Sequence, residues 1–415
     1  MVLDLICSLA SEENFVTIFD GREIKIPQRQ REVHRLSIRT SKVVVDTTGM
    51  AHVRSLSFTS NIVDQVLNIA SFQVMRVLDL EGCDISDIGY VADLLHLRYL
   101  GLKRTKVVDL PEEIGKLQFL QTLDIRGTCI VFVPASVVFL RRLMCLYVDE
   151  ETELPPGIGS LTSLEVLDEV NVRTLGSIHL NSHVVKELRH LTKLRVLQLR
   201  LAELDESISE VFVESLINLH KLESLSISFG HVDLMREGWV PPLQLRRLVI
   251  QHSFGKLLTL PTWINASSLP VLSYLSIMVY EVGPEDIQIL GMLPALRYLE
   301  LCADSRGVVP AEMHAVTTGA YPCAIECRFY GNTGAHPSIF ARGAAPRLKH
   351  LEFDFPAKWI SRGDINLDTW HLPSLEEVEA TVFTRGATDA EVKEATAALR
   401  AAADEHPNRP NLRIF

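Results

Sequence analysis

The feature that most constrains this 415-residue chain is a short apolar motif that returns along nearly its whole length. The motif has apolar residues at its first, fourth and sixth positions, as in Leu97-Arg-Tyr-Leu100-Gly-Leu102 and Leu296-Arg-Tyr-Leu299-Glu-Leu301. The alternation predicts one short strand per copy, with the fourth and sixth positions in a core and the third, fifth and seventh facing away. A single strand cannot bury its apolar side alone, so the copies are expected to stack.

Fifteen copies occur, from Val33 to Leu375, with a mean period of about 24 residues, which is typical of leucine-rich repeats. The predicted fold class is therefore an α/β repeat solenoid. We expect a leucine-rich-repeat horseshoe with about 15 parallel short strands on the concave face, spaced about 4.8 Å apart. Loops and short helices are expected on the convex face. Weaker copies begin at Val33, Val53, Leu143, Leu164, Ala324 and Leu375.

The segments between the strands carry a second pattern, as in Leu110-Pro-Glu-Glu-Ile114. Because proline has no N–H for a strand ladder, it is expected to end each strand and start the return path. The longer linkers, 164 to 194 and 296 to 324, are predicted to hold helices or loops. Glu169 falls at an inward position, which favours a local shift of register there over a buried carboxylate.

The ends of the chain differ from the repeats. Residues 1–30 are predicted as an N-terminal capping segment with a short amphipathic helix and a strand at Phe15–Phe19, and residues 31–385 as the solenoid. Residues 386–415 are predicted as a C-terminal helix and cap. Thr388-Asp-Ala-Glu391 matches a capping box, Pro407 stops the helix, and Asn411–Phe415 can add a last strand.

Composition narrows the classes of function. Lys and Arg number 41 against 52 Asp and Glu, and this net charge of −11 argues against a protein built mainly to bind nucleic acid. The apolar runs are too short for a membrane span, and seven scattered cysteines favour a reducing compartment. Phosphate-loop, zinc-helix and nucleophile-elbow motifs are missing from the sequence. We therefore expect no enzyme, no cofactor and no catalytic or metal-binding residues.

The outward positions of the copies hold the candidate partner-binding residues. Five of the eight tyrosines fall there, and tyrosine and arginine often anchor protein interfaces. An open alternative is that tyrosine simply suits strands and that charges alternate for solubility. The predicted concave-face contacts are Tyr99, Lys103, Arg126, Tyr147, Arg247, Tyr274, Tyr298, Arg328 and Tyr330, with the acids Asp79, Asp124, Asp168, Glu300, Glu352 and Glu379 on the same face.

A basic stretch stands out near the start of this acidic chain. Between Arg22 and Lys42 there are seven basic residues against Glu23 and Glu32. Such a patch can steer an acidic partner surface, although a solvated face explains it equally well. Its candidate docking residues are Arg22, Lys25, Arg29, Arg31, Arg35 and Arg39.

The order of these motifs resembles a known family. The opening Met1-Val-Leu-Asp-Leu-Ile-Cys-Ser-Leu, the run Val33-His-Arg-Leu-Ser-Ile38, the strand Leu78-Asp-Leu-Glu-Gly-Cys83 and the Leu-Pro-x-x-Ile-Gly-x-Leu linkers are similar to plant nucleotide-binding leucine-rich-repeat (NLR) immune receptors. The resemblance is to the repeat region of the coiled-coil class common in cereals, and it covers essentially the whole chain. It implies that residues 1–30 are the end of a nucleotide-binding module whose other residues map to no position here.

What the resemblance implies is a role in plant defence against disease. The repeats would recognise a pathogen effector or a guarded host protein, and the basic stretch would dock on a nucleotide-binding module to regulate it. The expected partners are proteins, and the expected compartment is the cytoplasm or the nucleus. The chain would then be a fragment, a truncated gene product, a decoy or a modulator.

Two other functions stay open on the sequence alone. One is a stand-alone scaffold or adaptor on the same repeat, for example for substrate recruitment to a ubiquitin ligase. The other is an extracellular receptor ectodomain, which is less favoured because Cys83, Thr105 and Thr128 stand where that group has asparagine.

Overall fold

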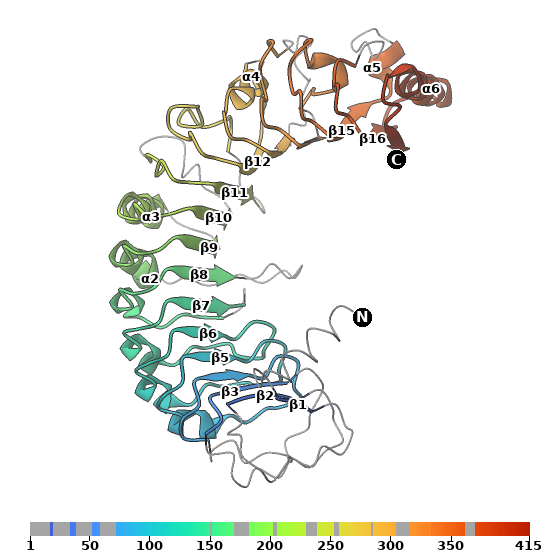
Figure 1. Cartoon of the computed structure of the whole chain (residues 1–415). Coiled ribbons are helices and arrows are strands. Elements are labelled where there is room, and N and C mark those ends of the chain that lie inside the picture. Colours follow the sequence, from blue (N-terminus) through green and yellow to red (C-terminus); the bar gives the residue numbers. More distant parts are fainter. Residues whose placement is uncertain are drawn as a thin grey trace. The chain divides into compact units, whose positions relative to one another are not determined.

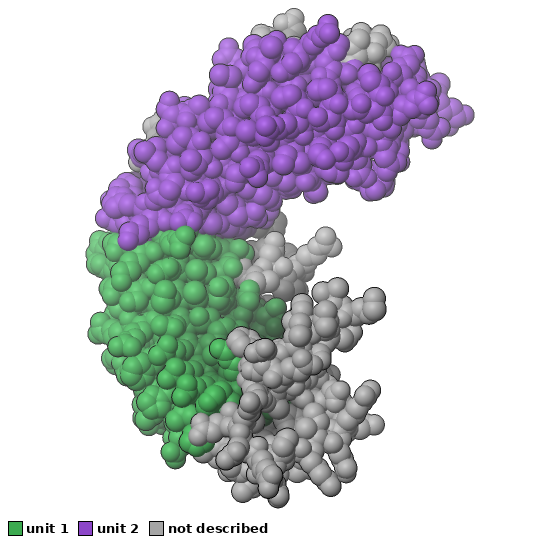
Figure 2. Space-filling model, viewed as in Figure 1, with its two compact units in different colours: residues 1–202 green, residues 203–415 purple. Residues whose placement is uncertain are grey.

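The computed structural model describes thirteen stretches of the chain, which divides into two compact units, Met1–Ala202 (unit 1) and Glu203–Phe415 (unit 2) (Figure 2). The described residues are 17–19, 34–38, 52–58, 72–149, 152–169, 182–201, 206–229, 239–252, 257–283, 285–303, 316–331, 333–361 and 370–415.

Unit 1 is built on parallel strands that pair in chain order (Figure 1). The fourth position of each copy packs inward, and Leu78, Leu100 and Leu123 have no exposed surface. The strands are β1 (Thr17–Phe19), β2 (Arg35–Ile38), β3 (Ser55–Phe58), β4 (Val77–Asp79), β5 (Tyr99–Gly101), β6 (Thr122–Asp124), β7 (Cys145–Val148), β8 (Val166–Glu169) and β9 (Val196–Leu201).

Single helical turns return the chain between the strands of unit 1. Pro111 and Pro134 each come directly before such a turn, so these prolines start the return path as predicted. They do not end the strands, because β5 and β6 already end at Gly101 and Asp124. Gly157 takes the same place in the next linker with a φ of 89°, which suits glycine. The turns are η2 (Gly89–Asp93), η3 (Glu112–Lys116), η4 (Ala135–Phe139), η5 (Ile158–Ser160) and η6 (Leu188–His190), and helix α2 (Ser182–Glu187) lies in the long linker.

Unit 2 repeats the plan with longer strands, again parallel and paired in chain order (Figure 1). Its strands are β10 (Ser224–Phe229), β11 (Arg247–His252), β12 (Tyr274–Val279), β13 (Tyr298–Ala303), β14 (Glu326–Gly331), β15 (His350–Pro356), β16 (Glu377–Phe383) and β17 (Asn411–Ile414). Its helices are α3 (Glu206–Ile217), α4 (Asp286–Gly291), η7 (Pro337–Ile339), α5 (Lys358–Ser361) and α6 (Asp389–Glu405).

The predicted C-terminal elements are confirmed. Helix α6 begins at a capping box in which the Thr388 hydroxyl accepts from the Glu391 N–H and the Glu391 carboxylate accepts from the Thr388 N–H. Strand β17 pairs in parallel with β16, as the sequence predicted. The expected N-terminal helix lies outside the described residues, and of the expected first strand the structure describes Thr17–Phe19.

The register shift expected at Glu169 is wrong. Glu169 stands opposite Val148, the inward residue of the preceding copy, so β7 and β8 keep one register to the end of β8. The hydrogen bonds of the parallel ladder fix the backbone there, whatever the side chain.

All fifteen predicted strands, β2 to β16, form in the predicted order, which confirms the leucine-rich-repeat solenoid. No helix in the described ranges is both long and apolar enough to cross a bilayer. The boundaries at residues 30 and 385 stay a prediction.

Candidate interaction face

The third, fifth and seventh positions of the copies lie together on the side of each sheet away from the core, here called the open face. The register of the strands places all five predicted tyrosines there, and each ring is half-buried. Half-buried tyrosines combine apolar contact area with a hydroxyl for a partner. The tyrosines are Tyr99, Tyr147, Tyr274, Tyr298 and Tyr330.

In unit 1, Tyr99 lies over Gly101, because a Cβ atom at Gly101 would stand 2.9 Å from Cε1 of its ring and 2.7 Å from the Asp79 carboxylate. The strand register sets Asp79 and Asp124 on either side of Gly101. Burial, and then these two carboxylates, raise the pKa of Tyr99 to about 12. Burial also raises the pKa of Asp79. The missing side chain at Gly101 is therefore what lets this tyrosine pack down among acids.

On the open face of unit 1, Arg126 and Lys103 are held by acids of the same face. Arg126 donates from Nε to Asp124 at 2.7 Å, and its guanidinium lies 4.5 Å from the ring centre of Tyr147. The hydrogen bond to Asp124 raises the pKa of Arg126. Lys103 pairs with Glu81 at 2.9 Å. These contacts fix the direction of each side chain before any partner arrives.

In unit 2, a stack of side chains crosses three strands. The rings of Tyr274 and Tyr298 lie 4.2 Å apart with 6° between their planes, and the Arg247 guanidinium lies 3.6 Å from the centre of the Tyr274 ring. All three residues are third positions of successive copies, so the ladder sets them opposite one another. Ring stacking and cation–π contact each add to the order of this patch.

The stack continues into acids at its far end. Tyr298 donates its hydroxyl to Glu300 at 3.0 Å, and burial together with Glu300 raises the pKa of Tyr298 well above its usual value. Arg328 lies 5.6 Å from the centre of the Tyr298 ring. Burial alone would lower the pKa of Arg328, but its hydrogen bond with Glu326 and its neighbour Tyr298 raise it. The guanidinium thus stays charged.

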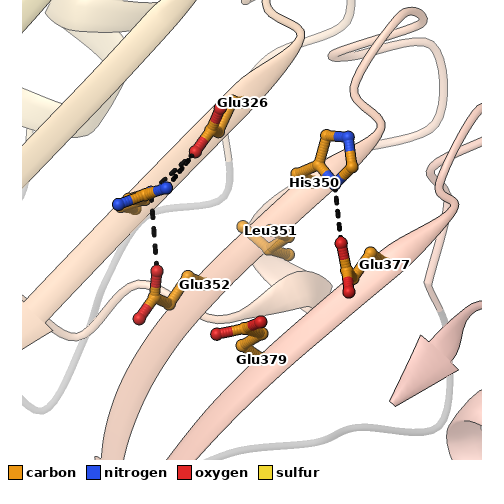
Figure 3. A pocket seen from close by; sticks show the side chains of 7 residues that line it. Glu326, His350, Leu351, Glu352, Glu377 and Glu379 are labelled. Carbon is orange, nitrogen blue, oxygen red and sulfur yellow. Dashed lines mark hydrogen bonds and ion pairs between the residues drawn. The ribbon is translucent and has the colours of Figure 1, made fainter. Parts of the chain in front are cut away.

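Beside the stack, the open face of β14 to β16 is hollowed by a pocket of about 270 Å³ (Figure 3). Arg328 reaches Glu326 at 2.6 Å and Glu352 at 3.5 Å, and His350 contacts Glu377 at 3.2 Å. The pocket lining is Glu326, Arg328, His350, Leu351, Glu352, Glu377 and Glu379.

Four residues of this region were not predicted from the sequence: Glu326, His350, Glu377 and Arg413. Arg413, on β17, bridges Glu377 at 2.5 Å and Glu379 at 2.6 Å. Three of the four are third positions of their copies, so an alignment of the copies could have identified them. Arg413 was missed because β17 is not a copy of the repeat motif.

Of the predicted docking patch, the structure describes Arg35, an exposed residue that begins β2. Arg22, Lys25, Arg29, Arg31 and Arg39 lie outside the described residues. Within the described part of the chain, no group of three or more His, Cys, Asp or Glu is arranged to hold a metal ion.

Comparison with known proteins shows which family this chain is similar to. A family model described as a leucine-rich repeat region matches residues 52–412. Disease resistance protein Pik-2 of rice is 28% identical over 343 residues, which are 71% of this chain and 33% of that protein. Disease resistance protein RGA5 of rice is 29% identical over 98% of this chain and 37% of its own length.

Two further similarities were found. Disease resistance RPP13-like protein 4 of Arabidopsis thaliana is 31% identical over 67% of this chain and 33% of its own length. A solved TDR receptor is similar with a TM-score of 0.48 at 16% identity, over 92% of this chain and 62% of that one. The chain spans about a third of the curated relatives it matches. This chain belongs to the leucine-rich-repeat family, as a repeat region homologous to those of plant disease resistance proteins.

Proposed function

We propose that this chain is a non-enzymatic recognition module in plant defence that binds another protein through its open face. The bound protein would be a pathogen effector or a host protein that the receptor guards. The observation that carries the proposal is the Arg247–Tyr274–Tyr298 stack, which presents two half-buried tyrosines and an exposed arginine on adjacent strands. Tyrosine and arginine are the side chains most enriched among the residues that dominate binding energy.

The order within the stack supports this role. A free tyrosine loses rotamer freedom when a partner binds, and this loss opposes association. Tyr298 is already held by the ring of Tyr274 on one side and by its hydrogen bond to Glu300. The patch can therefore offer contact area at a low entropy cost.

The proposal has a regulatory part as well. The basic residues from Arg22 to Lys42 would dock on an acidic surface of a nucleotide-binding module and hold it inactive until recognition occurs. Arg35 begins β2 and is exposed, in keeping with this role. The compartment we propose is the cytoplasm or the nucleus, where the homologous receptors would meet an effector.

The test of open-face binding is a comparison of captured proteins. The full chain, the Tyr274→Ala/Tyr298→Ala variant and a Phe139→Ala control are immobilised and exposed to extract from infected leaf tissue, and bound proteins are quantified by mass spectrometry. Phe139 is a matched aromatic control because it lies in η4, among the return turns, and is 57% exposed.

We expect at least one protein to be captured by the parent and the control but not by the tyrosine variant. Measured one at a time against that protein, each tyrosine substitution should cost more than about 1 kcal/mol, or about fivefold in Kd. Equal capture by all three forms would contradict binding through the open face.

A further inference from the structure

A second surface lies at the edge of the unit 1 sheet where the chain enters each strand. The second position of three successive copies is arginine: Arg54, Arg76 and Arg98, here called the arginine row. The Arg76 N–H donates to the Arg54 carbonyl at 2.7 Å, and the Arg98 N–H donates to the Arg76 carbonyl at 2.7 Å. The three residues therefore stand directly beside one another, about 4.8 Å apart along the ladder.

The arginine row has no counter-charge within the described part of the chain. All three side chains are exposed, and none forms an ion pair with a described carboxylate. Like charges this close repel one another even at the surface, so the row costs free energy in the isolated chain. An acidic partner would remove that cost.

Two pairs of second positions elsewhere in the chain have the partner of opposite charge that the arginine row lacks. Further along the unit 1 ladder, Glu165 and Arg195 are adjacent second positions and pair at 3.9 Å. In unit 2, Lys349 and Glu376 are adjacent second positions and pair at 2.6 Å. Where positive and negative second positions are adjacent, as in these two pairs, they neutralise each other. Arg54, Arg76 and Arg98 instead place three positive charges side by side.

Exposed apolar residues precede three successive strands at the same edge of the sheet. Val74, Leu95 and Phe119 come just before three successive strands and are 37%, 50% and 38% exposed. The ring of Phe119 lies 6.0 Å from that of His96 and 4.8 Å from the Arg142 guanidinium, so it is held in place while exposed. Cations together with exposed apolar groups suit a protein segment better than a nucleic acid.

We propose that the arginine row and its apolar neighbours bind an extended acidic segment of a partner protein. Carboxylates of the segment would pair with the three guanidiniums, and an apolar side chain would pack against Leu95 and Phe119. The bidentate geometry of arginine with carboxylate favours this match over a diffuse attraction. The inference rests on the proposed function, because it gives the chemistry of a partner contact at a surface separate from the tyrosine stack.

The test uses the full chain and a fluorescein-labelled peptide, acetyl-Glu-Asp-Leu-Glu-Asp-Phe-Glu-amide, with binding followed by fluorescence anisotropy at about 0.1 M and about 1 M salt. The test variant is Arg54→Gln/Arg76→Gln/Arg98→Gln. The control variant is Arg246→Gln/Arg297→Gln/Arg347→Gln, which removes the same charge from exposed residues of unit 2. Melting temperatures of the three proteins confirm that they fold alike.

The parent and the control should bind the peptide equally at low salt, and the test variant should bind about tenfold more weakly. Equal weakening in both variants would overturn the proposal, because net charge alone would then explain binding. Absence of binding by the parent at low salt would also overturn it. So would displacement of the peptide by a single-stranded oligonucleotide that binds the parent but not the test variant.

The peptide assay also separates this inference from the proposed function. Tyr274→Ala/Tyr298→Ala should bind the peptide as the parent does. If the peptide fails to bind while protein capture still depends on the tyrosines, the arginine row alone is rejected. If peptide binding holds while capture is equal in all forms, the open-face proposal alone is rejected.

Discussion

Gly101 provides the space that Tyr99 fills, and this makes one residue on the open face unusually sensitive to a single methyl group. A Cβ atom there would stand within 3.0 Å of both the Tyr99 side chain and the Asp79 carboxylate. Both groups are the ends of side chains, so the strand itself can stay in place.

We therefore predict that Gly101→Ala displaces the Tyr99 ring into solvent while changing the free energy of unfolding by less than about 1 kcal/mol. Hydroxyl-radical labelling should show greater oxidation of Tyr99 than in the parent. Gly89→Ala is the control, because its Cβ meets only the Asp87 carboxylate at 3.4 Å. An unchanged rate of Tyr99 oxidation in Gly101→Ala would contradict this packing.

His336 links stability to pH. It precedes η7, its Nδ1 is buried without a hydrogen-bond partner among the described residues, and burial lowers its pKa to about 4. The folded state therefore binds fewer protons at this residue than the unfolded state between pH 6.5 and pH 4. Its contribution to stability is lost as the pH falls through that window, by about 3 kcal/mol in full.

Replacing His336 with leucine removes the titrating group and fills a similar volume. The free energy of unfolding of His336→Leu, measured with urea at pH 7, 5 and 4, should fall less steeply with acidity than that of the parent. Parallel pH profiles for the two proteins would show that His336 is not buried as described. Carboxylates titrate in the same range, so the difference between the two profiles is the quantity to compare.

Some of the side-chain contacts on the open face could be predicted from the sequence. Tyr274 and Tyr298 occupy the same position of successive copies, so their contact follows from the alignment once the strands are parallel and in register. The position of the Tyr99 ring could not be predicted from the alignment, because it depends on the missing side chain at Gly101. The arginine row is equally visible in the alignment, at the second position of three successive copies, but it lies outside the outward third, fifth and seventh positions.

Among the elements, the strands were the easiest to predict. Their apolar positions repeat, and buried leucines such as Leu197 and Leu299 have no exposed surface. The linkers were harder, because only the proline-bearing ones carry a local signal. The linker from 164 to 194 shows the contrast, since only α2 (Ser182–Glu187) and η6 (Leu188–His190) are described beyond β8.

Helix α6 allows a test at the scale of one element. Thr388→Ala removes the hydroxyl that accepts from the Glu391 N–H and should destabilise the first turn by about 1 kcal/mol. Amide hydrogen exchange in the first turn of α6 should then be faster than in the parent. Thr388→Ser keeps a capping hydroxyl and should exchange like the parent. Equal exchange in the alanine variant would mean that the capping box does not hold this turn.

At the scale of the whole molecule, two surfaces differ in whether acidic side chains neutralise their cations. On the open face, the cations Arg126, Arg328 and Arg413 are each paired with acids. At the entry edge of unit 1, the arginine row is not paired with any described acid. The two surfaces therefore differ in the charge that they offer to a partner.

The most direct test of open-face recognition is hydroxyl-radical footprinting of the full chain, free and bound to the protein it captures. Binding through the open face predicts reduced oxidation of Tyr274 and Tyr298 in the complex, while Phe139 among the return turns keeps its rate. Protection of Phe139 with unchanged Tyr274 and Tyr298 would contradict the account, because the partner would then sit against the return turns instead of the strands.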